Sequence, residues 1–145
     1  MAKRILHPTD FSPASEPAFA YALQSARRDG AVLILAHVIE PISPIADESY
    51  VMWKRQAQEA AEAAARAAFD GLLARAKDTG VDARDLLLSG WPPEEIVNAA
   101  ATEAADVIVM GTHGRTGLRR LMLGSVAQQV VALAPCPVVT IREQR

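Results

Sequence analysis

The chain has 145 residues, of which half are hydrophobic and 22% are charged, and its formal net charge at pH 7 is -2. This is the composition of an ordinary globular protein and excludes a disordered or fibrous chain. With a sequence pI of about 5.9, the chain lacks the basic footprint of a nucleic-acid-binding protein, so we expect no nucleic-acid partner. Its length suits one hydrophobic core, and we expect a single domain over residues 1–145.

The start of the chain and its cysteine content bear on the compartment. The stretch "MAKRILHPTDFS" lacks the apolar region of a signal peptide, and no apolar run approaches the roughly 18 residues of a membrane-spanning helix. Cys136 is the single cysteine and cannot form an internal disulfide, which agrees with a reducing compartment. We therefore expect a cytoplasmic protein with no membrane partner.

The first two predicted elements are a strand and a helix. The strand is the short apolar run in "KRILHPTD", which stops at Pro8. The helix follows, with Ser12 as its N-cap, Pro13 in the first helical position and Gly30 just past its end. Its apolar residues recur at helical spacing, so one face is expected to pack on the strand.

A buried strand and a long helix come next. The almost continuous apolar run over residues 31–40 is typical of a strand covered on both faces of a parallel sheet. Residues 41–49 read as a loop, and residues 50–80 as an alanine-rich helix ended by Gly80. We expect one apolar stripe of this helix to pack on the core, and it comprises Trp53, Ala57, Ala60, Ala64, Ala68 and Leu72. The alternative is that part of this stripe contacts a partner.

The second half of the chain repeats this alternation. Strands are predicted over residues 81–90, 105–111 and 136–143, and helices over residues 91–104 and 125–134. Five strands that alternate with four helices predict an α/β fold, a single doubly wound, Rossmann-like parallel sheet. In such sheets ligands bind beyond the carboxyl ends of the strands, where the strand order reverses.

The stretch "GTHGRTGLRRLMLGS" lies at that edge, between a predicted strand and a predicted helix. Gly111, Gly114 and Gly124 are spaced G-x2-G-x9-G, and Ser125 follows at once. Glycines let a ligand approach the backbone, and the N-terminus of a helix attracts anions, so the spacing indicates a phosphate-binding loop. The alternative is that these glycines serve only turns and the start of the helix.

Two better-known phosphate loops do not match. A P-loop requires a lysine directly after its last glycine, and no lysine lies near these glycines. The dinucleotide fingerprint requires G-x-G-x-x-G after the first strand, where this chain has "HPTDFS". The histidines at positions 7, 37 and 113 each end a predicted strand, but without accompanying carboxylates at ligand spacing we expect no metal site.

The glycine spacing resembles the G-x2-G-x9-G-[ST] signature of the ATP-binding branch of the universal stress protein family. "KRILHPTDFS", "LILAHVIE" and "APCPVVTIRE" resemble the first, second and last strands of that family, and the resemblance covers essentially the whole chain. It implies the fold of the adenine nucleotide alpha hydrolase-like proteins and a bound ATP, with or without Mg²⁺.

The resemblance also implies which residues hold the nucleotide. Asp10 would lie against adenine and ribose, with Pro8 and Thr9 forming the adjoining wall, and the backbone at Val38 would read the adenine edge. The full implied set is Pro8, Thr9, Asp10, Val38, Met110, Gly111, His113, Gly114, Arg115, Gly124, Ser125 and Val126. His7 departs from the family pattern, in which an apolar residue is usual, and would make binding pH-dependent if it faced the pocket.

Two functions remain open from the sequence. The first is a regulatory module of the stress response that binds ATP without turning it over, because no catalytic constellation can be assigned. The alternative is a slow ATP hydrolase or nucleotidyl-cleaving enzyme of the same fold, with Asp10 and Ser125 as its candidate groups. For either function the resemblance implies a homodimer formed through the last strand, Val138–Arg142.

Overall fold

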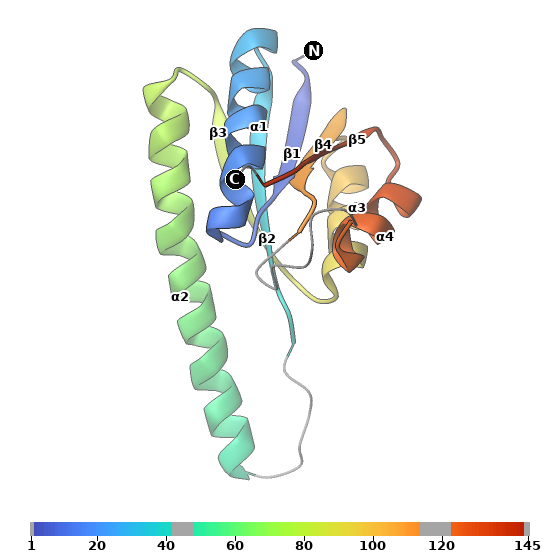
Figure 1. The fold of residues 1–145 in the computed structure, drawn as a ribbon. Coiled ribbons are helices and arrows are strands. Elements are labelled where there is room, and N and C mark those ends of the chain that lie inside the picture. The colour runs from blue at the N-terminus through green and yellow to red at the C-terminus, as the bar shows by residue number, and fades with distance from the viewer. Residues whose placement is uncertain (1, 42–47, 114–122, 144–145) are drawn as a thin grey trace.

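The computed structural model describes residues 2–41, 48–113 and 123–143 (Figure 1). Strands and helices alternate along the described chain, as the sequence predicts. The elements are β1 (Arg4–Pro8), a short 3-10 helix η1 (Pro13–Ser15), α1 (Glu16–Asp29), β2 (Val32–Ile39), α2 (Glu48–Asp78), β3 (Ala83–Ser89), α3 (Pro92–Thr102), β4 (Val107–Gly111), α4 (Ser125–Leu133) and β5 (Val138–Ile141).

The strands form one parallel, five-stranded sheet in the order β3-β2-β1-β4-β5. The predicted doubly wound α/β fold is therefore confirmed. The chain builds the sheet outward from β1 in one direction, and then crosses back to continue on the other side with β4. Leu6 in the middle of β1 pairs with Ile34 of β2 on one side and Ile108 of β4 on the other.

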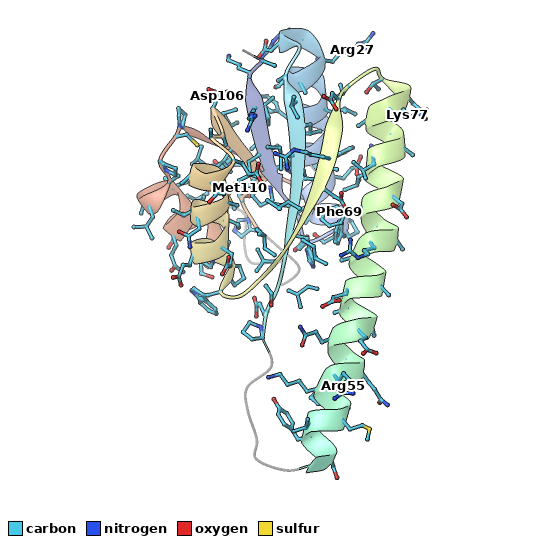
Figure 2. All side chains as sticks on the ribbon, turned by 180° about the vertical axis from the view of Figure 1, so that it is seen from behind. Arg27, Arg55, Phe69, Lys77, Asp106 and Met110 are labelled. Carbon is cyan, nitrogen blue, oxygen red and sulfur yellow. The ribbon has the colours of Figure 1, made fainter. Side chains whose placement is uncertain are left out.

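Helices cover both faces of the sheet and divide the core in two. Because side chains alternate along a strand, Ile5 of β1 joins the cluster under α1 and α2, whereas Leu6 joins the cluster under α3 and α4. In Figure 2, Phe69 lies between α2 and the sheet, and Met110 lies on the side of α3. Both layers are needed, since every interior strand of this sheet is apolar on both faces.

The first helix starts later than the sequence predicts. Ser12 and Pro13 do begin a helical segment, but it is the single 3-10 turn of η1, and the Ser12 side chain makes no capping hydrogen bond. α1 begins at Glu16, with a second proline in its first turn. Its end is as predicted, because Gly30 adopts the left-handed conformation with φ of 63°.

The long helix α2 packs on the sheet through a face that differs from the predicted one. Its fully buried residues are Ala65, Phe69 and Ala76. Of the expected stripe, Leu72 does pack against the core, whereas Trp53, Ala60 and Ala64 are exposed. Alanine occurs on all sides of this helix, so alanine spacing cannot define the buried face, and the large Phe69 side chain does. No helix in the described ranges is long and apolar enough to cross a membrane.

This difference in helix register can be tested with two adjacent substitutions. Ala65→Glu places a carboxylate in a position that is 2% exposed, and we expect it to lower the free energy of unfolding by about 3 kcal/mol or more. Ala64→Glu makes the same change on the exposed side and should alter that free energy, measured on the monomeric chain, by less than about 0.5 kcal/mol. Urea unfolding followed by circular dichroism measures both; equal losses would contradict the register.

Candidate functional site

A cavity of about 590 Å³ opens at the carboxyl edge of the sheet, where β1, β2 and β4 end. It lies next to the reversal of strand order, where ligands bind in open α/β sheets. All the described candidate residues line it, although they come from four separate stretches of the chain: Pro8, Thr9, Asp10, Val38, Met110, Gly111, His113, Gly124, Ser125 and Val126. Gly114 and Arg115, the two remaining candidates, lie outside the described residues.

Sequence reasoning missed several residues that also line the cavity. His37 and Glu40 come from the end of β2, Thr112 from the end of β4, and Ala61 from α2. His37, Glu40 and Thr112 lie at or just after the ends of predicted strands, so the sequence alone could have placed them at the carboxyl edge of the sheet. Ala61 carries no such signal, because an alanine in an alanine-rich helix looks the same on every face.

The turn after β1 is held by its own side chains. The Ser12 N–H donates to Asp10 Oδ1 (2.9 Å), and the Phe11 N–H donates to Thr9 Oγ1 (3.0 Å). The Thr9 hydroxyl in turn donates to the Ser15 hydroxyl (3.1 Å), which ties the turn to η1. Asp10 is therefore fixed at the rim of the cavity by the local hydrogen bonds of its own loop.

Phe11 takes an unusual backbone conformation in this turn. Its φ is 63°, in the left-handed region that residues with a side chain rarely adopt. Its ring packs against His37, with ring centroids 4.5 Å apart, and edge-on against Phe69 of α2 at 5.1 Å. His37 Nδ1 donates to the Thr9 carbonyl (2.8 Å), so β2 supports the turn as well. The turn is thereby packed between β2 and α2.

β2 runs on past the end of β1 and offers backbone groups to the cavity. The last backbone bond between them is donated by the Thr9 N–H to the Ala36 carbonyl (2.8 Å). In a parallel sheet, alternate residues direct their peptide groups to the same neighbour, so Val38 directs its groups toward the space beyond Thr9. The register pairs no β1 residue with Val38. Its peptide groups on this side therefore face the cavity.

The start of α4 forms another wall of the cavity. Gly124 is the N-cap of α4, and its N–H donates to the Thr112 carbonyl (2.7 Å). A Cβ at position 124 would lie 3.0 Å from that same carbonyl oxygen, which is a crowded contact, so the close approach of the two loops favours glycine. The first N–H groups of a helix have no partner within it, and Ser125 and Val126 bring theirs to the cavity.

His113 brings a polar side chain to the same wall. Its Nδ1 lies 3.0 Å from the Thr112 hydroxyl, which fixes the ring. Its Nε2 is buried and has no hydrogen-bond partner among the described residues. Since buried polar atoms normally have a partner, this atom is suited to a hydrogen bond with a ligand.

His7 does not belong to the cavity, so the condition for a pH-dependent pocket is not met. Its side chain points to the opposite face of the sheet, where it is fully buried beside Phe19, with ring centroids 5.9 Å apart. Nδ1 donates to the Val109 carbonyl (2.8 Å), while Nε2 has no partner among the described residues. Burial lowers the pKa of His7 to about 4, below neutrality.

The charges around the cavity are unevenly distributed. Among the described lining residues, Asp10 and Glu40 are acidic and none is lysine or arginine. The positive potential that the described wall offers an anion is therefore that of the α4 N-terminus. In the described part of the chain, no three histidine, cysteine or acidic side chains are grouped closely enough to hold a metal ion.

The Universal stress protein family model matches residues 1–142. The chain belongs to the universal stress protein family. A universal stress protein of Thermus aquaticus is 40% identical over 145 residues, which span 98% of this chain and 100% of that protein. Universal stress protein MJ0577 of Methanocaldococcus jannaschii is 29% identical, over 99% of this chain and 97% of its own.

Solved structures of relatives share the fold over nearly the whole chain. The structure of MJ0577 superposes with a TM-score of 0.80 at 31% identity, covering 100% of this chain and 99% of that one. UspA of Lactobacillus plantarum gives 0.85 at 26% identity, over 97% of both chains. An Archaeoglobus fulgidus universal stress protein, solved in complex with dAMP, gives 0.69 at 22% identity over 98% of both chains, a likeness that bears on the fold alone.

The burial of His7 predicts an acid-sensitive fold. In the unfolded chain its pKa returns to about 6.5, so between that value and about 4 the unfolded state binds more protons than the folded one. The contribution of His7 to the free energy of unfolding is thus complete above pH 6.5. We expect about 3 kcal/mol of it to be lost as the pH falls to 4.

The His7→Asn variant isolates this effect, because an amide donor can replace Nδ1 but does not titrate. The free energy of unfolding should fall less steeply with decreasing pH in the variant, while all other titrating groups remain the same. Denaturant unfolding at several pH values between 4 and 7 gives both slopes. Parallel curves for the two proteins would show that His7 is protonated as easily in the folded chain as in the unfolded one.

Proposed function

We propose that this chain is a single cytoplasmic module that binds ATP in the cavity and regulates a partner according to nucleotide occupancy. The observation that carries the proposal is the convergence of all the described candidate residues on one cavity at the strand-order reversal. Its volume of about 590 Å³ lies within the range of 300–1,000 Å³ of small-molecule pockets.

The end of the cavity near β1 and β2 suits adenine and ribose. Pro8, Val38 and Ile96 supply apolar walls, and the Val38 backbone can bond the edge of a flat base. The Asp10 carboxylate is fixed at the rim by the Ser12 N–H, where it can accept from a ribose hydroxyl. Ribose binding requires only that the Asp10 carboxylate is held in place, whereas hydrolysis would require Asp10 to activate a water molecule. We therefore favour binding over the alternative of slow hydrolysis.

The end of the cavity near α4 suits the phosphates. Helix N-termini bind phosphate through free N–H groups and the positive end of the helix dipole, and Gly124 lets the two loops meet closely enough for this. His113 Nε2 can add one further hydrogen bond. The described carboxylates of the lining, Asp10 and Glu40, lie at the other end, near β1 and β2, so a Mg²⁺ bound with ATP would be held mainly by phosphate oxygens and water.

The Ser125→Glu variant tests the phosphate end directly. A carboxylate in the first turn favours the helix itself but repels phosphate, so we expect ATP affinity to fall by a factor of about ten or more while adenosine still binds. Gln129→Glu adds the same charge one turn further along α4 and should have little effect. Calorimetric titration of all three proteins decides; equal ATP affinity in the Ser125→Glu variant would refute this placement of the phosphates.

We also propose a homodimer through the last strand, Val138–Arg142. β5 is an edge strand, so one side of its backbone is unpaired within the described sheet. The Thr112 N–H bonds the Ile141 carbonyl, and the Ile108 N–H bonds the Pro137 carbonyl. By alternation, the N–H groups of Val138 and Thr140 point outward, where a second copy could accept them.

Removing one of these outward donors should prevent strand pairing without harming the sheet. Proline is tolerated on an edge strand where the N–H faces away from the ladder, so Thr140→Pro should keep the fold and halve the mass of the assembly in solution. Thr140→Val retains the N–H and should leave the mass unchanged. Light scattering at micromolar concentration distinguishes them; an assembly that survives Thr140→Pro is not formed through β5.

A further inference from the structure

The outward face of α2 carries an unbroken row of small side chains. They lie at helical spacing, opposite the buried Ala65 and Phe69, and all are exposed: Ala60, Ala63, Ala64, Ala67, Gly71 and Ala74. We call this row the alanine stripe. Trp53, 54% exposed, extends it toward the start of the helix. In Figure 1, α2 lies at the outside of the molecule, so the stripe is accessible to another chain.

Gly71 is not explained by the fold of the monomer. It lies inside a helix, where glycine is less favourable than alanine, and its φ is ordinary. A Cβ added at this position would have no neighbour within 4 Å, so no close approach in the described chain requires glycine. Because glycine has no Cβ, it allows a second helix backbone to come close at this exposed position.

The charges beside the alanine stripe are self-complementary. Glu59, Arg66, Asp70 and Lys77 lie along one flank of the stripe and are exposed. If a second α2 is placed antiparallel, with a two-fold axis near position 68, Glu59 lies beside Lys77 of the second copy, and Arg66 beside its Asp70. In a two-fold parallel pair this flank would instead face the other flank of the second helix, so Lys77 would lie beside Arg75 and the remaining charges beside alanines. The order of charges therefore selects the antiparallel pair.

We propose that α2 pairs with α2 of a second copy of this chain, antiparallel and along the alanine stripe. Small side chains allow the helix axes to approach to about 8 Å, the lower end of the usual range. The interface is isologous, as expected for a two-fold dimer. The flanking ion pairs are exposed and fix the direction and register of the helices, while the close contact of the stripe supplies the attraction.

This interface is separate from the proposed pairing through β5. α2 covers β2 and β3, at one end of the strand order, whereas β5 is at the other end. In Figure 2, Lys77 points away from the sheet, so the charged flank is not used to hold α2 in place. The helix is held through its inner face and by Arg75, which pairs with Glu16 of α1.

Site-specific crosslinking tests the pairing, in the full chain with Cys136→Ser to remove the native thiol. Ala67→Cys lies beside the proposed two-fold axis, so a short bifunctional maleimide should join two copies at this position. Ala60→Cys lies on the same stripe but about 24 Å from its own copy along the pair, and should not crosslink. Ala20→Cys, an exposed position of α1, controls for random collisions. Equal crosslinking at all three positions would overturn the proposal, as would none at position 67.

Charge reversal provides an independent readout. In the Thr140→Pro chain, which lacks the proposed pairing through β5, Arg66→Asp places like charges together in the antiparallel pair and should weaken dimer formation at least fivefold in sedimentation equilibrium. Combining it with Asp70→Arg restores opposite charges, both within the helix and between copies, and should recover the original dissociation constant. If the double variant remains as weak as the single one, or the single variant dimerises normally, the antiparallel register is wrong.

Discussion

β1 must pair with two strands at once, and the rest of the structure depends on this constraint. Because Leu6 is bordered by Ile34 and Ile108, β1 is buried on both edges as well as on both faces. The chain leaves β1 toward α1 and returns on its other side at β4, so the loops that follow these strands diverge. The cavity occupies the space between them. The position of the site thus follows from strand order before any particular side chain is considered.

Most of the fold could be predicted from the sequence, because buried parallel strands appear as short, continuous apolar runs between helices with clear ends. The register of α2 could not. When alanine occupies most positions of a helix, the apolar pattern has no preferred direction. The buried side is fixed by the few large side chains that pack against the core, Phe69, Leu72 and Leu73. The face of the sheet to which His7 points could be predicted from the alternation of side chains along β1, because His7 is two residues from Ile5 and so lies on the same face.

The residues of the candidate site likewise include some that the sequence predicts and some that it does not. The spacing of the glycines along the chain predicts Gly111 and Gly124, whereas Pro8, Thr9 and Asp10 in the turn after β1 are implied by the family resemblance. Ala61 could not be predicted, since it reaches the cavity through packing that exists only in the folded protein. The Thr112 carbonyl oxygen lies so close to Gly124 that it would crowd a Cβ at that position, which explains in steric terms why this position of the spacing favours glycine.

Phe11 is subject to two opposing demands. Its backbone conformation favours glycine, whereas its position between His37 and Phe69 favours an aromatic ring. Glycine at this position would relax the turn but leave a hollow under α2; any other bulky residue would fill the hollow but keep the strain. The loop that carries Asp10 is thus shaped as much by the core beneath α2 as by the cavity beside it, and substitutions at Phe69 and at Phe11 are expected to change together over evolutionary time.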